Sequence, residues 1–135
     1  YKHPFTVAYM DIDNFKVVNY RFGHKAGDQL LRSVADTVRK NLRKLHIISR
    51  FGGDEFTILL PETGAEAAQV VLSRMRNVLL NIMETNKWPV TFTFGTVTFL
   101  KPPSSVEEMV KKVGSLMYAG KDSGMNTIEQ EIVNA

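Results

Sequence analysis

Apolar residues recur along this chain with two different spacings, and these spacings predict the order of its elements. Runs of β-forming residues, continuous or alternating with polar residues, predict strands. Apolar residues that repeat at helical spacing predict amphipathic helices packed on a sheet. The predicted elements are a strand over 5–10, a short helix and loop over 14–24, a helix over 26–43, strands over 46–51 and 55–60, a helix over 64–83, a strand over 90–99, a helix over 106–119 and an edge strand over 127–130.

Polar residues stand directly before three of the predicted helices. Asn14 precedes the short helix, Thr63 precedes the helix over 64–83, and a serine precedes the helix over 106–119. A side-chain oxygen at this position accepts a hydrogen bond from a free N–H group of the first helical turn. We therefore expect these residues to cap their helices.

The order of strands and helices predicts an α/β sandwich of the α+β kind, with a mostly antiparallel central sheet of about five strands. One connection, between the strands over 46–51 and 55–60, is short enough for a hairpin, and helices join the other strands. We expect the helices to cover one face of the sheet, in a ferredoxin-like palm. With 135 residues the chain is long enough for one domain with its own core.

Composition excludes several kinds of site. Hydrophobic residues make up 44% of the chain and charged residues 23%, values that are ordinary for a globular domain. The chain has no cysteine, which excludes disulfides, thiolate metal sites and cysteine nucleophiles. No apolar run approaches the ~20 residues that span a bilayer, so we expect no membrane contact by this domain. The net charge of +3 is mild and its basic residues are scattered, which argues against nucleic acid as a partner.

The most informative polar stretch lies between the two strands of the predicted hairpin. Gly52 and Gly53 suit a tight reversal there, because glycine adopts positive φ without steric cost. Two carboxylates follow them, Asp54 and Glu55. A rigid turn that presents hard oxygen ligands suits Mg²⁺, which completes its coordination shell with water and substrate phosphates. An ordinary hairpin with a solvated acidic turn is the alternative that this stretch alone leaves open.

A second acidic site follows the first predicted strand. The apolar run over 5–10 leads into Asp11, and the C-terminal end of a buried strand is where open α/β sheets place their ligands. If this strand lies beside the hairpin, Asp11 converges with Asp54 and Glu55. Three carboxylates at one place repel one another unless metal ions bridge them. The sequence therefore predicts a metal site at this point.

The two acidic sites belong to a longer series of motifs along the chain. In chain order these are Asp-Ile-Asp-Asn-Phe-Lys over 11–16, Asn19, Gly23-His24, Gly27-Asp28, Arg50-Phe51-Gly52-Gly53-Asp54-Glu55-Phe56, Leu60-Pro61, Thr93-Phe94-Gly95, Leu116-Met117-Tyr118, Lys121 and Gly124-Met125-Asn126. In order and spacing this series resembles the GGDEF domain of diguanylate cyclases. The resemblance covers nearly the whole chain, and several motifs in register are more specific than any single one.

The resemblance implies an enzyme that condenses two GTP molecules into cyclic di-GMP and releases two pyrophosphates. It also implies that two domains meet face to face as a homodimer, each with one GTP and two Mg²⁺, for which Mn²⁺ can substitute. Two metal ions suit an in-line displacement because they stabilise the attacking and leaving oxygens together. By position the metal ligands are Asp11, Asp54 and Glu55, assisted by the Ile12 carbonyl. Whether Glu55 also helps to deprotonate the attacking hydroxyl stays open.

The resemblance assigns two residues to the guanine base, Asn19 and Asp28. A carboxylate accepts hydrogen bonds from guanine N1–H and from its exocyclic amine, and an amide bonds the remaining edge. This pattern of donors and acceptors distinguishes guanine from adenine. On the sequence alone, Asp28 would be interpreted as a favourable charge near a helix N-terminus.

Two lysines, Lys16 and Lys121, correspond to contacts with the triphosphate. Backbone amides around Asn14 and Phe15 would help to hold the terminal phosphate, and Gly52 and Gly53 would leave room for it. Without the resemblance, either lysine would be interpreted as a surface charge.

The chain departs from the family pattern at several positions. Met125 stands where the family usually has an arginine on the phosphates, so one positive contact is missing. Tyr20 replaces a common aspartate and Val113-Gly114 replaces a common Ala-Asp pair, and we interpret both changes as structural. Relatives that are inhibited by their own product carry an Arg-x-x-Asp motif shortly before the acidic turn. Here Arg43 is present but His46 replaces the aspartate, so we expect no product-inhibition site.

Three other functions stay open as alternatives. The principal one is a catalytically weak or inactive GGDEF-like module that binds GTP and signals to a neighbouring domain, and Met125 favours it. A palm-type nucleotidyl transferase acting on nucleic acid shares the metal chemistry, but the weak positive charge argues against it. A pure scaffold is disfavoured because packing requires no acids at positions 11, 54 and 55 together.

The whole chain, 1–135, is interpreted as a single GGDEF domain that lacks the usual N-terminal helix of the family. We expect it to be the trimmed output end of a longer sensor protein with an upstream sensor domain. The expected location is the cytoplasm, or the cytoplasmic end of a membrane-bound sensor.

Overall fold

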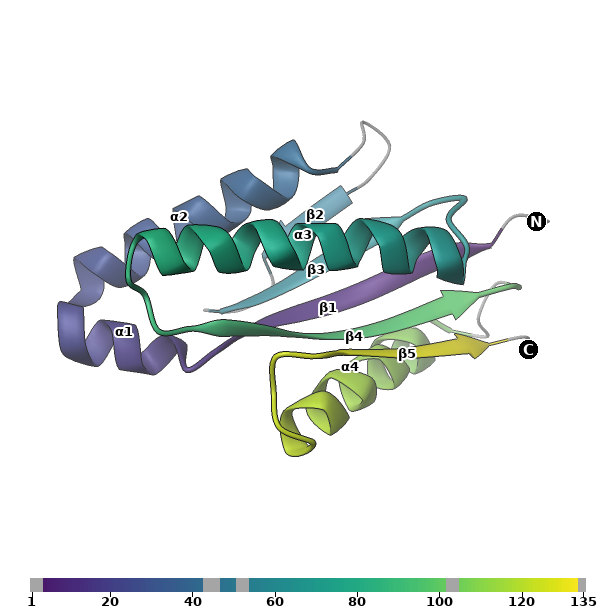
Figure 1. The fold of residues 1–135 in the computed structure, drawn as a ribbon. Coiled ribbons are helices and arrows are strands. Elements are labelled where there is room, and N and C mark those ends of the chain that lie inside the picture. The colour runs from purple at the N-terminus through teal and green to yellow at the C-terminus, as the bar shows by residue number, and fades with distance from the viewer. Residues whose placement is uncertain (1–3, 43–46, 51–53, 102–104, 134–135) are drawn as a thin grey trace.

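The structure is a computed structural model that describes residues 4–42, 47–50, 54–101 and 105–133. In this part of the chain, five strands form one sheet and four helices pack on it (Figure 1). The elements, in chain order, are β1 (Phe5–Asp13), α1 (Phe15–Phe22), α2 (His24–Lys40), β2 (Ile47–Arg50), β3 (Glu55–Leu60), α3 (Ala65–Thr85), β4 (Thr91–Phe99), α4 (Val106–Asp122) and β5 (Ile128–Val133).

The sheet has the strand order β2-β3-β1-β4-β5, with β1 at its centre. β1 pairs antiparallel with both β3 and β4, and β2 pairs antiparallel with β3. β4 and β5 pair in parallel. The predicted sandwich with a mostly antiparallel five-stranded sheet is therefore confirmed.

The central strand β1 is buried along nearly its whole length, from Thr6 to Asp13. Ala8 and Met10 point into the larger core, which β1 shares with α2 and α3. Val7 and Tyr9 point to the opposite face, into a smaller core with α4. A strand buried on both faces reads as a continuous apolar run rather than an alternating one, as this strand does from Val7 to Met10.

The expectation that the helices cover one face of the sheet is wrong. α2 and α3 lie on one face, and α4 lies on the other (Figure 1). Because β4 and β5 are parallel, a crossover connection must join them, and α4 is that connection. Its Val113 and Met117 cover apolar side chains of β1 and β4 that would otherwise face water.

The ends of the elements differ from the prediction in ways that affect the site. β1 extends to Asp13, beyond the predicted end at residue 10, because it keeps its pairing with β4. Asn14 occupies the N-cap position of α1, but its side chain makes no capping hydrogen bond. Thr63 is not a cap: Gly64 is the N-cap of α3, and the Thr63 hydroxyl donates to the Pro61 carbonyl at 2.8 Å. The predicted serine cap of α4 is confirmed.

That serine is Ser105, whose side chain accepts a hydrogen bond from the N–H of Glu108 at 3.1 Å.

Among the helices that the structure describes, none is long and apolar enough to cross a membrane.

Candidate functional site

The acidic end of β1 lies beside the start of β3, as the sequence predicts. Asp11 pairs directly with Glu55 in the antiparallel register, and the N–H of Ile12 donates to the carbonyl of Asp54 at 3.2 Å. Side chains that face each other across two strands lie close together, and like charges in this arrangement are destabilising. The register therefore places Asp11 opposite Glu55 and next to Asp54, at neighbouring positions of the sheet.

Asp11 is buried and poorly satisfied. Its Oδ2 atom lies 3.0 Å from the Nζ atom of Lys121. Its Oδ1 atom is also buried and has no hydrogen-bond partner among the described residues. Burial raises the pKa of Asp11 to about 6, and the charges of Asp54 and Glu55 add to this effect, although Lys121 opposes it.

Asp13 lies on the same face of β1, is fully buried and has many partners. Its carboxylate accepts hydrogen bonds from the hydroxyls of Thr91 and Thr93 on β4, at 2.7 and 2.8 Å. It also accepts from the N–H of Asn126 at 3.0 Å and from Nζ of Lys121 at 2.9 Å. Burial alone would raise the pKa of Asp13, but these hydrogen bonds outweigh it and hold the pKa below its usual value.

Asp13 is not among the predicted site residues. A usable signal was present, because residues two apart on a strand face the same side, and Asp13 follows Asp11 at that spacing. The threonines Thr91 and Thr93 have the same spacing on the paired strand and lie opposite Asp13 and Asp11.

Lys121, predicted to contact the triphosphate, lies near the C-terminal end of α4 and reaches back to β1. Its ammonium group bridges Asp11 and Asp13. Burial would lower the pKa of Lys121, but the two carboxylates outweigh burial and raise it. The lysine is therefore held in its charged form, beside the carboxylates rather than in open solvent.

The residues at this site fit a divalent metal of the magnesium type. The unpartnered Oδ1 atom of Asp11 is a hard oxygen ligand without a partner, next to two further carboxylates. Within the described ranges, however, no three acidic, histidine or cysteine side chains are grouped closely enough to hold a metal ion by themselves. An open site with few protein ligands suits Mg²⁺, which keeps water and substrate oxygens in its shell.

Asn19 and Asp28, the predicted guanine readers, lie on the neighbouring helices α1 and α2. The amide of Asn19 lies against Gly27, where the Cβ of any other residue would collide with it. Asp28 follows Gly27 and is exposed. The close approach at Gly27 brings Asn19 against the helix that carries Asp28.

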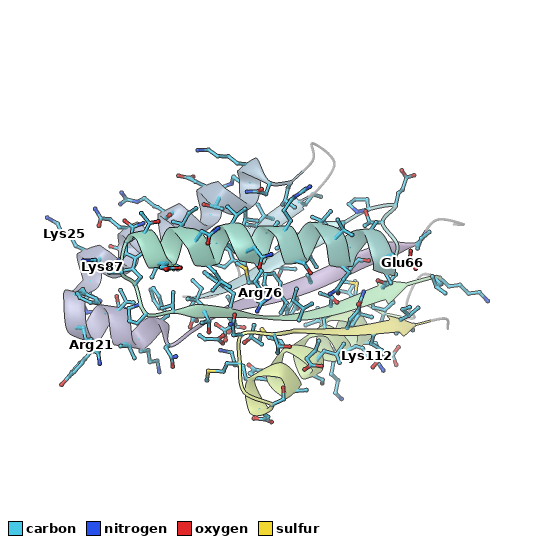
Figure 2. The ribbon with its side chains drawn as sticks, viewed as in Figure 1. Arg21, Lys25, Glu66, Arg76, Lys87 and Lys112 are labelled. Atoms are coloured by element: carbon cyan, nitrogen blue, oxygen red, sulfur yellow. The ribbon has the colours of Figure 1, made fainter. Side chains whose placement is uncertain are left out.

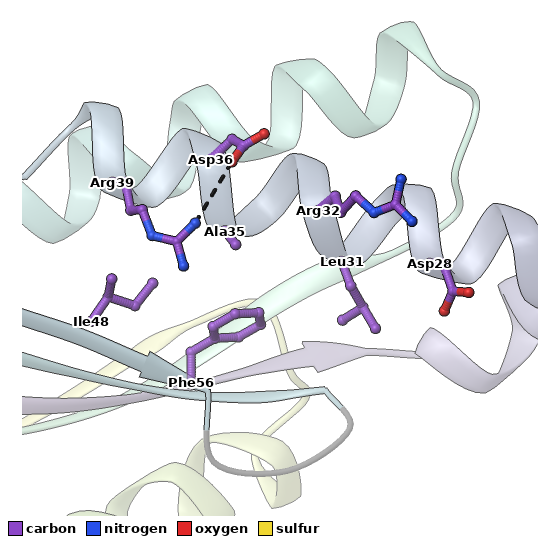
Figure 3. A pocket seen from close by; sticks show the side chains of 8 residues that line it. All are labelled: Asp28, Leu31, Arg32, Ala35, Asp36, Arg39, Ile48 and Phe56. Atoms are coloured by element: carbon purple, nitrogen blue, oxygen red, sulfur yellow. Dashed lines mark ion pairs between the residues drawn. The ribbon is translucent and has the colours of Figure 1, made fainter.

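Asp28 also lies at one end of a pocket of about 380 Å³ between α2 and the β2–β3 pair (Figure 3). None of the other lining residues is among the predicted site residues. These are Leu31, Arg32, Ala35, Asp36, Arg39, Ile48 and Phe56. Figure 3 shows Arg39 and Asp36 as an ion pair at the far end of the pocket, 3.7 Å apart.

The residues predicted to hold the terminal phosphate follow β1 directly. Asn14 adopts a left-handed conformation, with φ of 64° and ψ of 25°, and starts α1. The Phe15 side chain packs against the larger core, and Lys16 is exposed. The backbone thus turns at Asn14, directly after β1. The first N–H groups of α1 therefore lie near the end of β1, the strand that carries Asp11.

Several predicted site residues lie outside the described residues. These are Gly52 and Gly53 of the acidic turn and Arg43 and His46 of the position where relatives bind product.

The loop after α4 has a constrained backbone. Gly124, Met125 and Asn126 all have positive φ, of 126°, 65° and 49°. The Arg76 guanidinium donates to the Asn126 carbonyl at 2.9 Å and to its side-chain oxygen at 3.3 Å. Figure 2 shows Arg76 reaching from α3 toward the strands of the sheet. Met125, in place of the arginine expected from the resemblance, is partly exposed and brings no charge to the site.

Known proteins with a similar sequence include diguanylate cyclases. The model of the GGDEF family, described as diguanylate cyclase, GGDEF domain, matches residues 1–127. Diguanylate cyclase DgcP of Pseudomonas aeruginosa is 35% identical over 125 residues, which cover 91% of this chain and 19% of DgcP. Probable diguanylate cyclase DgcT of Escherichia coli is 30% identical over 139 residues, which cover 98% of this chain and 31% of DgcT. The chain therefore spans a minor part of the length of these relatives.

A solved structure shares the fold. The crystal structure of diguanylate cyclase SiaD from Pseudomonas aeruginosa, in complex with its activator SiaC, superposes with a TM-score of 0.83 at 26% identity. The superposition covers 96% of this chain and 50% of the SiaD chain.

Proposed function

Because this chain belongs to the GGDEF domain family of diguanylate cyclases, we propose that it condenses two GTP molecules into cyclic di-GMP with release of two pyrophosphates. The observation that carries this proposal is the register of β1 and β3, which pairs Asp11 with Glu55 beside Asp54. No packing requirement accounts for three carboxylates at one point, and a divalent metal under a triphosphate does.

Asp11, Asp54, Glu55 and the carbonyl of Ile12 would hold Mg²⁺, two ions in each site, and Mn²⁺ could replace it. When bound, the two ions would stabilise the attacking 3′-hydroxyl oxygen and the leaving pyrophosphate oxygen together. Asp11 must be deprotonated to serve as a ligand, and its raised pKa of about 6 lies below neutral pH. Glu55 is partly exposed, so it can either ligate metal or accept the proton of the hydroxyl.

Asp28 and Asn19 would read the guanine base. Asp28 would accept from guanine N1–H and the exocyclic amine, and the Asn19 amide would bond the remaining edge. Their placement across the α1–α2 contact at Gly27 supports this assignment.

Lysines and backbone amides would hold the triphosphate. Lys16 would approach from the exposed side of α1, and Lys121 from the end of α4. The N–H groups that follow Asn14 would bind the terminal phosphate, because the first N–H groups of a helix have no partner within the helix. Gly52 and Gly53 would leave room for the phosphates to approach.

A second copy of the chain would be required for turnover. Each site holds one GTP, and the 3′-hydroxyl of one GTP attacks the α-phosphorus of the other. We further propose that an upstream sensor domain in the full-length protein controls the meeting of the two copies.

The test is incubation with GTP and Mg²⁺ at high protein concentration, or with forced dimerisation, followed by detection of cyclic di-GMP. Product is expected from the wild-type chain and is expected to be lost in Asp11→Ala and Glu55→Ala. Glu66→Ala is the control and should keep activity, because it removes an exposed carboxylate at the start of α3, at the end of the sheet where β1 begins rather than where it ends (Figure 2). Absence of cyclic di-GMP from a dimerised wild-type chain would contradict the proposal.

A second candidate function is a GTP-binding regulatory module with little or no turnover. Met125 favours it, because the loop beside Lys121 then lacks a positive charge for the phosphates. The same incubation discriminates the two functions: GTP binding without product supports the module. Restored turnover in Met125→Arg would identify the missing charge as the cause.

A further inference from the structure

The two carboxylates that share Lys121, those of Asp13 and Asp11, differ in how many other hydrogen bonds they accept. Asp13 is fully buried and accepts hydrogen bonds from Thr91, Thr93 and the Asn126 N–H besides Lys121. Asp11 has Lys121 on Oδ2, and its buried Oδ1 has no partner among the described residues. Asp13 is therefore a fixed anchor for the lysine, and Asp11 is an exchangeable partner.

A second layer of contacts holds the anchor itself. Arg76 of α3 binds both the carbonyl and the side-chain oxygen of Asn126, whose N–H donates to Asp13. The Asn126 N–H also lies 3.0 Å from the Thr93 hydroxyl, which donates to Asp13. These bonds tie β1, β4, α3 and the loop after α4 to one carboxylate that contacts no solvent.

We propose that Asp13 holds Lys121 as an internal counter-ion of Asp11, which an incoming divalent metal replaces, leaving the lysine free to contact the phosphates of GTP. This inference rests on the proposed function, because it concerns how the same site receives its metal and substrate. Asp13 acts here through Lys121 and is a positioning residue.

The chemistry of the lysine supports this exchange. An ammonium group has three donors, and in the described structure Lys121 uses one on Asp13 and one on Asp11. In the metal-free protein its charge offsets the repulsion among Asp11, Asp54 and Glu55. A metal that binds the free Oδ1 atom of Asp11 repels the ammonium group on Oδ2 of the same carboxylate. Because Asp13 retains the lysine, the released donor stays within the site.

The first test measures binding of Mn²⁺ to the nucleotide-free chain. Binding is monitored as the loss of the electron paramagnetic resonance signal of the free ion. Lys121→Met removes the competing cation, so it should tighten Mn²⁺ binding by about tenfold, a coupling of ordinary size between two ligands of one site. Lys112→Met is the matched control, because Lys112 lies on the same helix but pairs with Glu131 of β5 at 2.6 Å (Figure 2). Unchanged or weaker binding in Lys121→Met, or no binding in either chain, would overturn the exchange.

The second test asks whether Asp13 acts through Lys121. The affinity for a GTP analogue with a methylene group between the α- and β-phosphates is measured with Mg²⁺ in Asp13→Asn, Lys121→Met and the double variant. Positioning predicts that Asp13→Asn weakens binding about tenfold in the wild-type background and has little effect once Lys121 is removed, because the two changes delete one interaction. A merely structural role would give additive losses and would overturn the assignment.

The failure of this inference is distinguishable from failure of the proposed function. The Mn²⁺ titration uses no nucleotide and reads no product. If Lys121→Met tightens Mn²⁺ binding but the chain makes no cyclic di-GMP, the inference is supported and the cyclase activity is contradicted. If the chain makes cyclic di-GMP but Lys121→Met does not tighten Mn²⁺ binding, the cyclase activity is supported and the inference is contradicted.

Discussion

Asp11 and Asp13 lie on one face of β1, yet their surroundings give them opposite ionisation behaviour. Asp13 has four donors and a pKa below its usual value, whereas burial and two neighbouring carboxylates raise the pKa of Asp11 to about 6. Hydrogen bonds to the charged form account for the first effect, and desolvation accounts for the second. One aspartate is thus stable as an anion inside the protein, and the other shares Lys121 and keeps one buried oxygen without a partner among the described residues.

At the same scale, Asp28→Ala is expected to reduce selection of GTP over ATP. The carboxylate is proposed to accept from the two guanine donors that adenine does not present in that arrangement, and hydrogen bonds of charged groups contribute ~1.5–3 kcal/mol. The preference for GTP should fall by about tenfold or more. Calorimetric titration with GTP and ATP analogues checks this, with Glu66→Ala as the control. A variant that keeps the full preference for GTP would remove Asp28 from base recognition.

Single residues were predictable where a motif or a strand end marked them. Asp11 and Glu55 were found because a carboxylate at the end of an apolar run is conspicuous, and the observed register confirms that they meet. Asp13 was given no role because its partners come from β4 and from the loop after α4, far away in sequence. The contact of Lys121 with both aspartates could not be foreseen either, since it depends on where α4 packs.

At the scale of elements, α4 is the helix that sequence periodicity placed least well. An apolar stripe shows that a helix packs on a sheet, but it does not show on which face. The unbroken apolar run from Val7 to Met10 in β1 was the available indication that both faces are covered. Because Lys121 lies on α4, the position at which this helix packs on β4 determines where the Lys121 ammonium group lies relative to Asp11.

At Gly95 of β4 the backbone of the strand lies very close to the backbone of α4. A Cβ at Gly95 would lie 2.7 Å from the Val113 carbonyl oxygen and 2.8 Å from the Met117 Cα, both backbone atoms of α4 that cannot turn aside. Gly95→Ala should therefore displace α4, lower the free energy of unfolding by ~1–3 kcal/mol and weaken binding of the GTP analogue as Lys121 moves. Thermal unfolding and calorimetry measure the two effects.

Gly114 of α4 provides the matched control. Its Cβ would meet a ring atom of Tyr9 at 3.9 Å, an ordinary contact. Gly114→Ala should leave the helix in place and stabilise the fold by roughly 0.5–1 kcal/mol, because glycine is unfavourable within a helix. Equal stability of the two alanine variants would show that the packing of α4 on β4 does not depend on the close approach at Gly95.

At the scale of the whole molecule, the absence of the Arg-x-x-Asp motif predicts that cyclic di-GMP does not inhibit the chain through that position. His46 offers no carboxylate to the product where relatives carry an aspartate. Turnover should be insensitive to added cyclic di-GMP at concentrations that do not compete with GTP in the active site. Non-competitive inhibition by cyclic di-GMP would contradict this prediction.

The pH dependence of folding should report the environment of Asp11. Its pKa lies near 3.8 when unperturbed and rises to about 6 in the folded chain. Between these values the folded state binds more protons than the unfolded state, so the contribution of Asp11 to stability falls as pH rises from about 4 to about 6. Asp13, whose pKa is lowered, has the opposite effect, and its contribution is lost only as pH falls below about 4.

Asp11→Asn isolates the first contribution. The free energy of unfolding of the variant, minus that of the wild type, should increase from pH 4 to pH 6 and then level off, with a span on the order of 3 kcal/mol, since the shift is about two pKa units and one unit corresponds to ~1.4 kcal/mol. Urea denaturation in a chelating buffer measures this difference without metal. Added Mg²⁺ should reduce it at neutral pH, because a cation that binds the charged carboxylate in the folded state stabilises that state. A difference that stays flat from pH 4 to pH 6 would mean that Asp11 is solvated in the folded chain, and the unpartnered oxygen would then give no reason to place a metal there.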